Sequence, residues 1–259
     1  MPLMPGAEPF THSGGSTGVL LCHGFTGTPA SLRPWADYLA GAGLSVSLPR
    51  LPGHGTTWQD MNHTRWEDWY AEVDRAYEEL RGHATEIFVM GLSMGGCLAL
   101  RMAELRGDGV AGLVLVNPSL AADTKLFLLA PALKFVLPSL PGIGSDIKKE
   151  GAHELSYDRV PVRAAATLPQ LWKLTQGQLG EVTQPVLVYL STTDHVVGPN
   201  SMRVLRGALP GGQLTVRECP DSYHVATLDN DAEQIFTGSL EFVRAHSHAG
   251  MEGGEVDAK

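Results

Sequence analysis

The length, composition and charge of the chain already exclude several classes of protein. The chain has 259 residues, of which 43% are apolar and 18% charged, and its formal net charge is −9. This apolar fraction excludes wholesale disorder, and the length can form one large domain or two small ones. The acidic balance argues against nucleic acid or an anionic membrane surface as the main partner, because no domain-wide basic patch is available.

Short apolar runs alternate with helical patterns along most of the chain. The expected strands are residues 18–22, 44–48, 86–90, 110–116, 186–190 and 213–218. The expected helices are residues 30–42, 66–80, 94–106, 168–179, 200–209 and 231–245. Strands that are apolar throughout are typical of a parallel sheet covered on both faces. The alternation therefore predicts an α/β fold with a mostly parallel central sheet flanked by helices.

The alternation breaks between residues 118 and 168, where proline is frequent. This stretch is too short and too rich in proline to form a core of its own, so we interpret it as an insertion that packs over the sheet. The polar, glycine-rich tail, residues 247–259, is expected to be disordered. The sequence thus predicts a single domain over residues 1–246.

The three cysteines follow no spacing of the kind that binds zinc, and no metal site is expected. They are Cys22, Cys97 and Cys219. We interpret them as buried free thiols, which favours a reducing, cytoplasmic location. The first ten residues lack the basic and apolar regions of a signal peptide. No apolar run reaches the roughly 18 residues that a transmembrane helix needs.

The segment Gly91–Gly95 has the pattern G-x-S-x-G between an expected strand and an expected helix. A sharp turn at this point would lift the Ser93 hydroxyl clear of the sheet. It would also place the hydroxyl at a helix N-terminus, where free N–H groups favour developing negative charge. We therefore expect Ser93 to be a nucleophile.

A serine hydroxyl needs a base, and one of the ten histidines occupies a suitable position. His224 follows the last expected strand and a turn, at the edge of the sheet where chemistry gathers in doubly wound folds. Asp194 follows the strand at 186–190, and would hold the imidazole in the required tautomer. Three aspartates near the histidine remain alternatives for the acid: Asp221, Asp229 and Asp231.

A loop after the first buried strand is expected to complete an oxyanion hole. In this arrangement one donor is the backbone N–H that follows the nucleophile, here that of Met94. The other comes from a loop after an early strand, and we assign it to Phe25. His23 would then organise this loop, and His54 is interpreted as a turn histidine.

Five segments carry a resemblance to a known family. They are H-G-F-T-G-T-P (23–29), L-P-R-L-P-G-H-G-T (48–56), G-L-S-M-G-G (91–96), D-H-V-V (194–197) and S-Y-H-V-A-T-L-D (222–229). Together they resemble the bacterial monoacylglycerol lipases and the related small carboxylesterases of the α/β-hydrolase superfamily. The resemblance implies the α/β-hydrolase fold, with the nucleophile at Ser93, the acid at Asp194 and the base at His224. It places the oxyanion donors at Phe25 and Met94.

The resemblance also implies a substrate and a role for the insertion. The expected reaction is cleavage of monoacylglycerols to glycerol and fatty acid through an acyl-enzyme on Ser93, without a cofactor. The insertion would be a small cap around an apolar acyl tunnel, with Ile143 and Glu154 binding substrate and Glu154 contacting the glycerol hydroxyls. The apolar residues 126–129 either touch a lipid surface transiently or pack inward.

The residues leave two other readings of function open. A general short-chain carboxylesterase or a thioesterase would use the same three side chains, because its specificity would depend on the shape of the cap. A ligand-binding protein without useful turnover would have no need for all three groups. The oligomeric state is not readable from the sequence.

Overall fold

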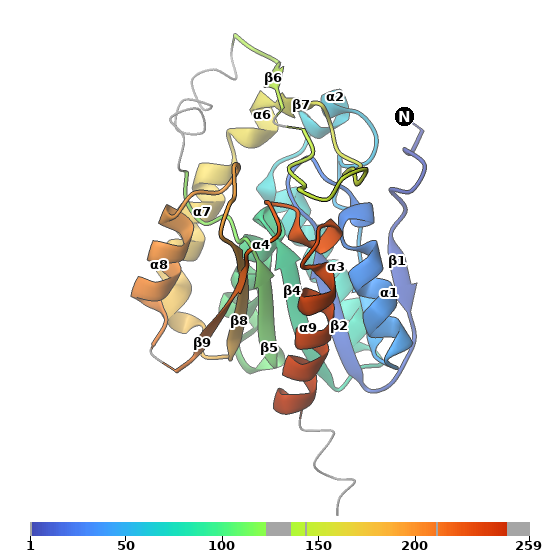
Figure 1. The fold of residues 1–259 in the computed structure, drawn as a ribbon, viewed down its shortest axis with the longest axis vertical. Helices are drawn as coiled ribbons and strands as arrows, with labels where there is room; N and C mark the ends of the chain where they lie inside the picture. Colours follow the sequence, from blue (N-terminus) through green and yellow to red (C-terminus); the bar gives the residue numbers. More distant parts are fainter. Residues whose placement is uncertain (1, 123–135, 143, 211, 248–259) are drawn as a thin grey trace, which may run out of the picture.

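The fold is built around a seven-stranded sheet, seen in the middle of Figure 1. The computed structural model describes residues 2–122, 136–142, 144–210 and 212–247. The strands are β1 (Phe10–His12), β2 (Thr17–Cys22), β3 (Ser45–Leu48), β4 (Glu86–Leu92), β5 (Gly112–Val116), β8 (Val186–Ser191) and β9 (Leu214–Cys219). Their order is β1-β3-β2-β4-β5-β8-β9, and every pair is parallel except β1 with β3. The predicted mostly parallel sheet is confirmed.

Helices cover both faces of this sheet (Figure 1). The helices of the described residues are α1 (Arg33–Gly41), α2 (Trp58–Met61), α3 (Trp66–Arg81), α4 (Met94–Arg106), α6 (Val162–Ala165), α7 (Leu168–Gln178), α8 (Asn200–Ala208) and α9 (Ala232–His246). Of these, the short helices α2 and α6 lie beyond one end of the sheet rather than on its faces. Short 3-10 turns occupy Pro29–Ser31, Gly107–Gly109, Leu179–Glu181 and Ala226–Leu228. The six expected helices correspond to α1, α3, α4, α7, α8 and α9.

Alternate side chains of each strand enter two separate apolar cores. Val114 and Val116 of β5 pack in the core formed with α1 and α9. Leu113 and Leu115 of the same strand pack in the core formed with α3, α4 and α7. Strands β2, β4, β5 and β8 are buried on both faces and almost entirely apolar, which is the pattern that made them recognisable in the sequence. Strand β9 is partly exposed and also carries polar side chains.

Part of the region predicted as an insertion lies above one end of the sheet. Strand β6 (Ser139–Pro141) pairs antiparallel with β7 (Arg159–Pro161), and α6 follows directly (Figure 1). These short elements, together with β1 and α2, were not expected from the sequence. Each has three or four residues, which is too few to show a period.

Several predictions from the sequence fall outside the described residues. They concern the apolar run 126–129, Ile143 and the tail from residue 248. Ser247, predicted to begin a disordered tail, is described and donates a hydrogen bond to Glu86. None of the helices in the described part of the chain is long and apolar enough to cross a membrane.

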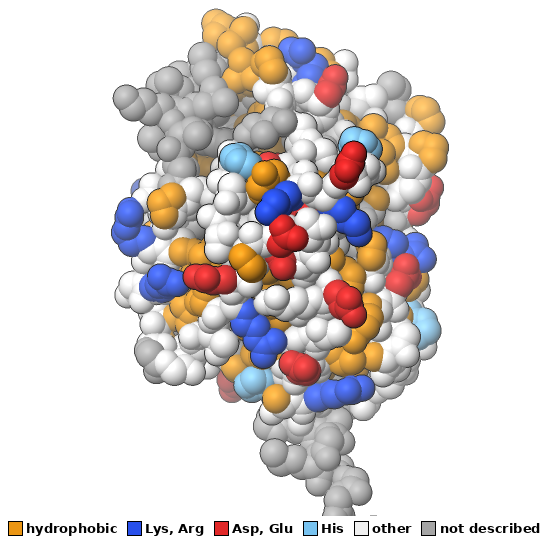
Figure 2. All heavy atoms as spheres, in the orientation of Figure 1, with side chains coloured by type: hydrophobic (Ala, Val, Ile, Leu, Met, Phe, Trp, Pro, Cys, Tyr) orange, Lys and Arg blue, Asp and Glu red, His pale blue; other side chains and the backbone are white. Residues whose placement is uncertain are grey.

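The surface carries both charges and a small exposed apolar area. Acidic and basic side chains are interspersed over the face shown in Figure 2. Apolar side chains gather at the end that holds β6 in Figure 1. Just before β6 in the chain, Val136 is 73% exposed and Leu137 is 38% exposed.

The three cysteines are buried and unpaired.

The start of α4 is pressed against the ends of β2 and β4. A Cβ atom added to Gly95 would lie 1.9 Å from the carbonyl oxygen of Cys22, and one added to Gly91 would lie 2.3 Å from the backbone of Gly95. No side chain fits at either position, since real Cβ atoms do not approach other heavy atoms so closely. Glycine at these two positions therefore permits the sharp turn between β4 and α4.

We predict that Gly95→Ala destabilises the protein by at least about 3 kcal/mol, because the backbone of β2 would have to move. Gly177→Ala is a matched control, since a Cβ atom at this helical position meets nothing within 4 Å. The control should change stability by less than about 1 kcal/mol, towards stabilisation. Urea unfolding of both variants measures the difference, and equal midpoints would contradict the packing argument.

Candidate active site

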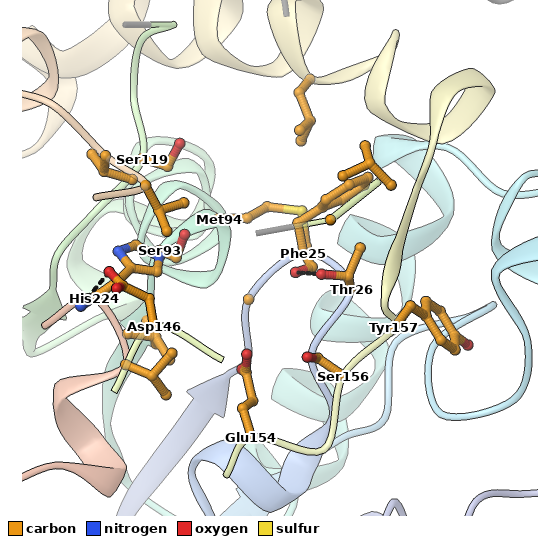
Figure 3. A pocket seen from close by; sticks show the side chains of 18 of the residues that line it. Phe25, Thr26, Ser93, Met94, Ser119, Asp146, Glu154, Ser156, Tyr157 and His224 are labelled. Atoms are coloured by element: carbon orange, nitrogen blue, oxygen red, sulfur yellow. Dashed lines mark hydrogen bonds between the residues drawn. The ribbon is translucent and has the colours of Figure 1, made fainter. Parts of the chain in front are cut away.

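Ser93 occupies the turn between β4 and α4 in a strained backbone conformation. Its φ is 56° and its ψ is −120°, outside the regions that residues with a side chain ordinarily adopt. Hydrogen bonds hold the turn: Ser93 N–H donates to the carbonyl of Val116 over 2.9 Å, and its own carbonyl accepts from Ser119 N–H over 3.0 Å. The side chain lines a pocket above the sheet (Figure 3).

His224 and Asp194 form a buried pair. The distance from His224 Nδ1 to Asp194 Oδ2 is 2.8 Å, and the two side chains are 8% and 7% exposed. The other carboxylate oxygen accepts the backbone N–H groups of Val196 and Val197, each over 2.8 Å. Burial by itself would raise the pKa of Asp194, but His224 and the two amides lower it below its ordinary value.

The pairing determines which nitrogen of His224 faces the pocket. An ionised carboxylate only accepts hydrogen bonds, so Nδ1 carries the proton that is donated to Asp194. Nε2 is then left as an acceptor on the other side of the ring. Figure 3 shows the Ser93 hydroxyl and the His224 ring pointing toward one another, and both residues line the same pocket.

The three alternative acids have other partners among the described residues. Asp229 accepts the backbone N–H groups of Tyr223 and Lys148, and Asp231 accepts the hydroxyl of Ser222. Asp221 forms an ion pair with Lys148 over 2.6 Å. Asp194 is thus the aspartate that contacts the imidazole of His224.

The backbone amides of Phe25 and Met94 are available at the pocket. Both residues line it, and neither N–H donates a hydrogen bond to any group in the described part of the chain. Thr26 has a positive φ of 63°, and its hydroxyl donates to the carbonyl of Phe25 over 2.6 Å. The Phe25 ring packs edge-on against Trp69, with centroids 5.6 Å apart.

Buried His23 ties the loop of Phe25 to a neighbouring turn. Its Nδ1 lies 3.0 Å from the carbonyl oxygen of Gly24, and its Nε2 accepts the backbone N–H of Leu51 over 3.2 Å. Burial lowers the pKa of His23 to about 4, so the ring is neutral and Nδ1–H donates. His54 packs edge-on against this ring at 5.0 Å, and its Nδ1 lies 3.1 Å from the carbonyl oxygen of Pro52.

The pocket has a polar side and an apolar side. Glu154 and Ser156 project into it in Figure 3, and Glu154 Oε1 accepts the Ser31 hydroxyl over 2.7 Å. Burial raises the pKa of the Glu154 carboxyl, although hydrogen bonds from Ser31 and Ser156 oppose the shift. The apolar lining residues include Phe25, Leu92, Met94, Ala121, Ala122, Val160, Leu168, Trp172, Val196, Val197 and Val225.

Asn117 is a site residue that the sequence reasoning missed. It directly follows β5, has a φ of 44° and is 1% exposed. Its Nδ2 donates to the carbonyl of His224 over 2.8 Å, and its Oδ1 accepts the backbone N–H of Ser191 over 2.8 Å. Asn117 directly follows a buried strand, and other site residues also follow strands. This position could have identified it from the sequence.

The pocket brings together groups that are suited to nucleophilic chemistry. Among the residues that the structure describes, no group of three or more His, Cys, Asp or Glu side chains is arranged to hold a metal ion. The pocket presents a serine, a histidine bound to a carboxylate, and free backbone amides. Such a set suits nucleophilic attack on a carbonyl group.

Comparisons with known proteins agree with this arrangement. The thermostable monoacylglycerol lipase of Bacillus sp. (strain H-257) is 41% identical over 247 residues, which cover 95% of this chain and 98% of that protein. The carboxylesterase of Bacillus subtilis (strain 168) is 25% identical over 91% of this chain and 96% of its own length. A solved structure from work on the metagenome-derived lipolytic enzymes LipS and LipT has a TM-score of 0.91 and 38% identity. The alignment with that structure covers 95% of this chain and 100% of the matched chain.

These similarities confirm the predicted fold and extend over nearly the whole chain. The match to a family of serine hydrolases runs from residue 16 to residue 231 and includes β2, the turn at Ser93 and the loop of His224. The chain belongs to that family, serine aminopeptidase S33 (Hydrolase_4), within the α/β-hydrolase superfamily.

Proposed function

We propose that this protein is a serine ester hydrolase that cleaves monoacylglycerols to glycerol and fatty acid, with Ser93 as nucleophile, His224 as base and Asp194 as acid. The main support is that the strained Ser93 lines one pocket together with His224, whose ring lies 2.8 Å from the Asp194 carboxylate on its other side. These residues are distant in the sequence and come together at the end of the sheet.

The proposed chemistry is acyl transfer to water. As the Ser93 hydroxyl attacks the ester carbonyl carbon, His224 Nε2 takes its proton, and Asp194 stabilises the resulting imidazolium. The alcohol then leaves with that proton, and the acyl group remains on Ser93 as an ester. A water molecule, deprotonated by His224, attacks this ester, and the imidazolium then returns the proton to Ser93 Oγ as the bond to the fatty acid breaks.

The free amides of Phe25 and Met94 are the proposed donors to the oxyanion. Negative charge develops on the carbonyl oxygen when the tetrahedral intermediate forms, and fixed N–H donors stabilise it without reorganisation. Met94 is the first residue of α4, so the helix N-terminus adds to this stabilisation. The loss of one such donor typically lowers the rate by about 10²–10³-fold.

The two sides of the pocket support a substrate with a polar head and an apolar chain. We assign the acyl chain to the apolar side and the glycerol to the polar side, where Glu154 and Ser156 project. The 41% identical relative is named a monoacylglycerol lipase, which favours the same substrate here. A general carboxylesterase, the name of the 25% identical relative, or a thioesterase remains the alternative.

We further propose that the region 118–168 is a cap within a single domain over residues 1–246. Gly142, Glu154 and Val160 from this region line the pocket, which supports a role in enclosing substrate. The exposed side chains of Val136 and Leu137 support transient contact of the cap with a lipid surface. The cytoplasmic location stays a prediction from the sequence.

Ser93→Ala tests the nucleophile. We expect wild-type protein to hydrolyse 1-monolauroylglycerol with a higher kcat/KM than dilauroylglycerol, ethyl butyrate, lauroyl-CoA or an amino-acid p-nitroanilide. The variant should lose at least about 10⁴-fold in kcat, because without its nucleophile the triad no longer functions. Fatty-acid release measures the rates, and circular dichroism checks the fold.

The comparison of these five substrates separates the alternative activities that would use the same triad. A preference for ethyl butyrate or lauroyl-CoA would favour the carboxylesterase or thioesterase. A preference for the anilide would favour a peptidase. Full activity of the Ser93→Ala variant would rule out the proposed mechanism.

Glu154→Gln tests the assignment of the glycerol side. The ratio of kcat/KM for 1-monolauroylglycerol to that for ethyl laurate should fall about fivefold, since a hydrogen bond typically contributes about 1 kcal/mol. Glu150→Gln is the matched control, because Glu150 is an exposed glutamate of the same segment. If both variants change the ratio equally, the carboxylate of Glu154 does not recognise the glycerol.

A further inference from the structure

Asp146 is a buried carboxylate that joins the two loops carrying the proposed acid and base. It is 8% exposed and belongs to the region proposed as a cap. Its Oδ2 accepts the backbone N–H of His224 over 3.1 Å and that of His195 over 3.2 Å. Its Oδ1 lies 2.8 Å from Nδ1 of the His195 ring. His195 directly follows Asp194, so one carboxylate holds both loops (Figure 3 shows Asp146 beside His224).

The segment around Asp146 is itself fixed to the loop of His224. The backbone carbonyl of Asp146 accepts the N–H of Val225 over 3.1 Å. Two residues later, Lys148 N–H donates to Asp229 over 2.7 Å, and the same carboxylate accepts Tyr223 N–H. The Asp146 carboxylate therefore has a defined position relative to both loops.

The peptide groups on the two sides of His224 are held by residues outside its own loop. Asp146 accepts its N–H, and Asn117 donates to its carbonyl over 2.8 Å. The ring is held separately by Asp194. Because a misplacement of about 1 Å in a catalytic group can cost about 10²-fold in rate, such backbone contacts bear directly on catalysis.

Asp146 does not compete with Asp194 as the acid of the triad. Its Oδ2 contacts the backbone N–H of His224, whereas Asp194 contacts the ring nitrogen. Burying a carboxylate is costly, and three N–H contacts offset that cost here. All three contacts are with His195 or His224, which points to the relative placement of the two loops rather than to the general stability of the cap.

We infer that Asp146 is a positioning residue: its carboxylate fixes the separation of the acid loop and the base loop, and so keeps His224 aligned between Asp194 and Ser93. This inference rests on the proposed function. It predicts that Asp146 acts on the chemical step through His224, with little effect on substrate binding.

Asp146→Ala is the primary test. Active sites are titrated by labelling to completion with a fluorophosphonate, and kcat and KM for 1-monolauroylglycerol are then expressed per labelled site. We expect kcat per site to fall roughly 10–100-fold, as for other side chains that orient a functional group, while KM changes less than about threefold. Asp146→Asn retains one carbonyl oxygen for the two backbone N–H groups, and should recover most of the lost kcat.

Two further variants keep the test decisive. Asp158→Ala removes an exposed aspartate from the same region, and should leave kcat per site unchanged. Asp146→Ser keeps a polar group but is too short to reach both loops, so it should show the loss of kcat if the alanine variant does not fold.

The outcomes distinguish the positioning role from the proposed function. A variant with fewer labelled sites but wild-type kcat per site would show that Asp146 only stabilises the fold, and would overturn the inference. An equal loss in Asp146→Asn and Asp146→Ala would also overturn it, because the backbone contacts would then not matter. If wild-type protein releases no fatty acid and is not labelled at Ser93, the proposed function itself fails.

Discussion

The close approach of α4 to β2 is the constraint on which the site depends. Without a Cβ at Gly95, the helix can begin directly over the backbone of Cys22. The chain then has no room for an ordinary loop after β4, and Ser93 adopts a positive φ. A conformation of this kind costs about 1–3 kcal/mol, and it persists because the buried strands and α4 fix the segments on both sides. The same turn presents the Ser93 hydroxyl to the pocket and leaves the amide of Met94 without a protein acceptor among the described residues.

The parallel sheet supplies the second requirement, which is proximity. The carboxyl ends of β4, β5, β8 and β9 lie at the same end of the sheet, because these neighbouring strands are all parallel. Ser93, Asn117, Asp194 and His224 each follow one of these strands. Residues up to 131 positions apart in sequence can therefore contribute to one pocket, while the rest of each strand is free to be purely apolar.

This geometry explains which parts of the protein could be predicted from sequence. Strands β2, β3, β4, β5 and β8 are buried almost throughout, so their burial leaves a signal in the sequence, whereas β9 is partly exposed. Asp194 and His224 could be located because they follow β8 and β9, the last two expected strands. The short strand β1 lies at the edge of the sheet, and Phe10–His12 has no recognisable pattern. The contacts of Asp146 and Asn117 link segments that are 49 to 107 positions apart, and no local pattern encodes such a distance.

Two carboxylates from the same region face the pocket, and their partners suit them to different tasks. Asp146 is bound to backbone amides and to a histidine ring, which are fixed by the loops that carry them. Its oxygens are occupied whether or not a substrate is present. Glu154 is bound to the hydroxyls of Ser31 and Ser156, which rotate freely and can turn to another acceptor. Of the two, Glu154 can exchange a partner for a substrate hydroxyl, so alignment of the base and recognition of the alcohol are separated within one short segment.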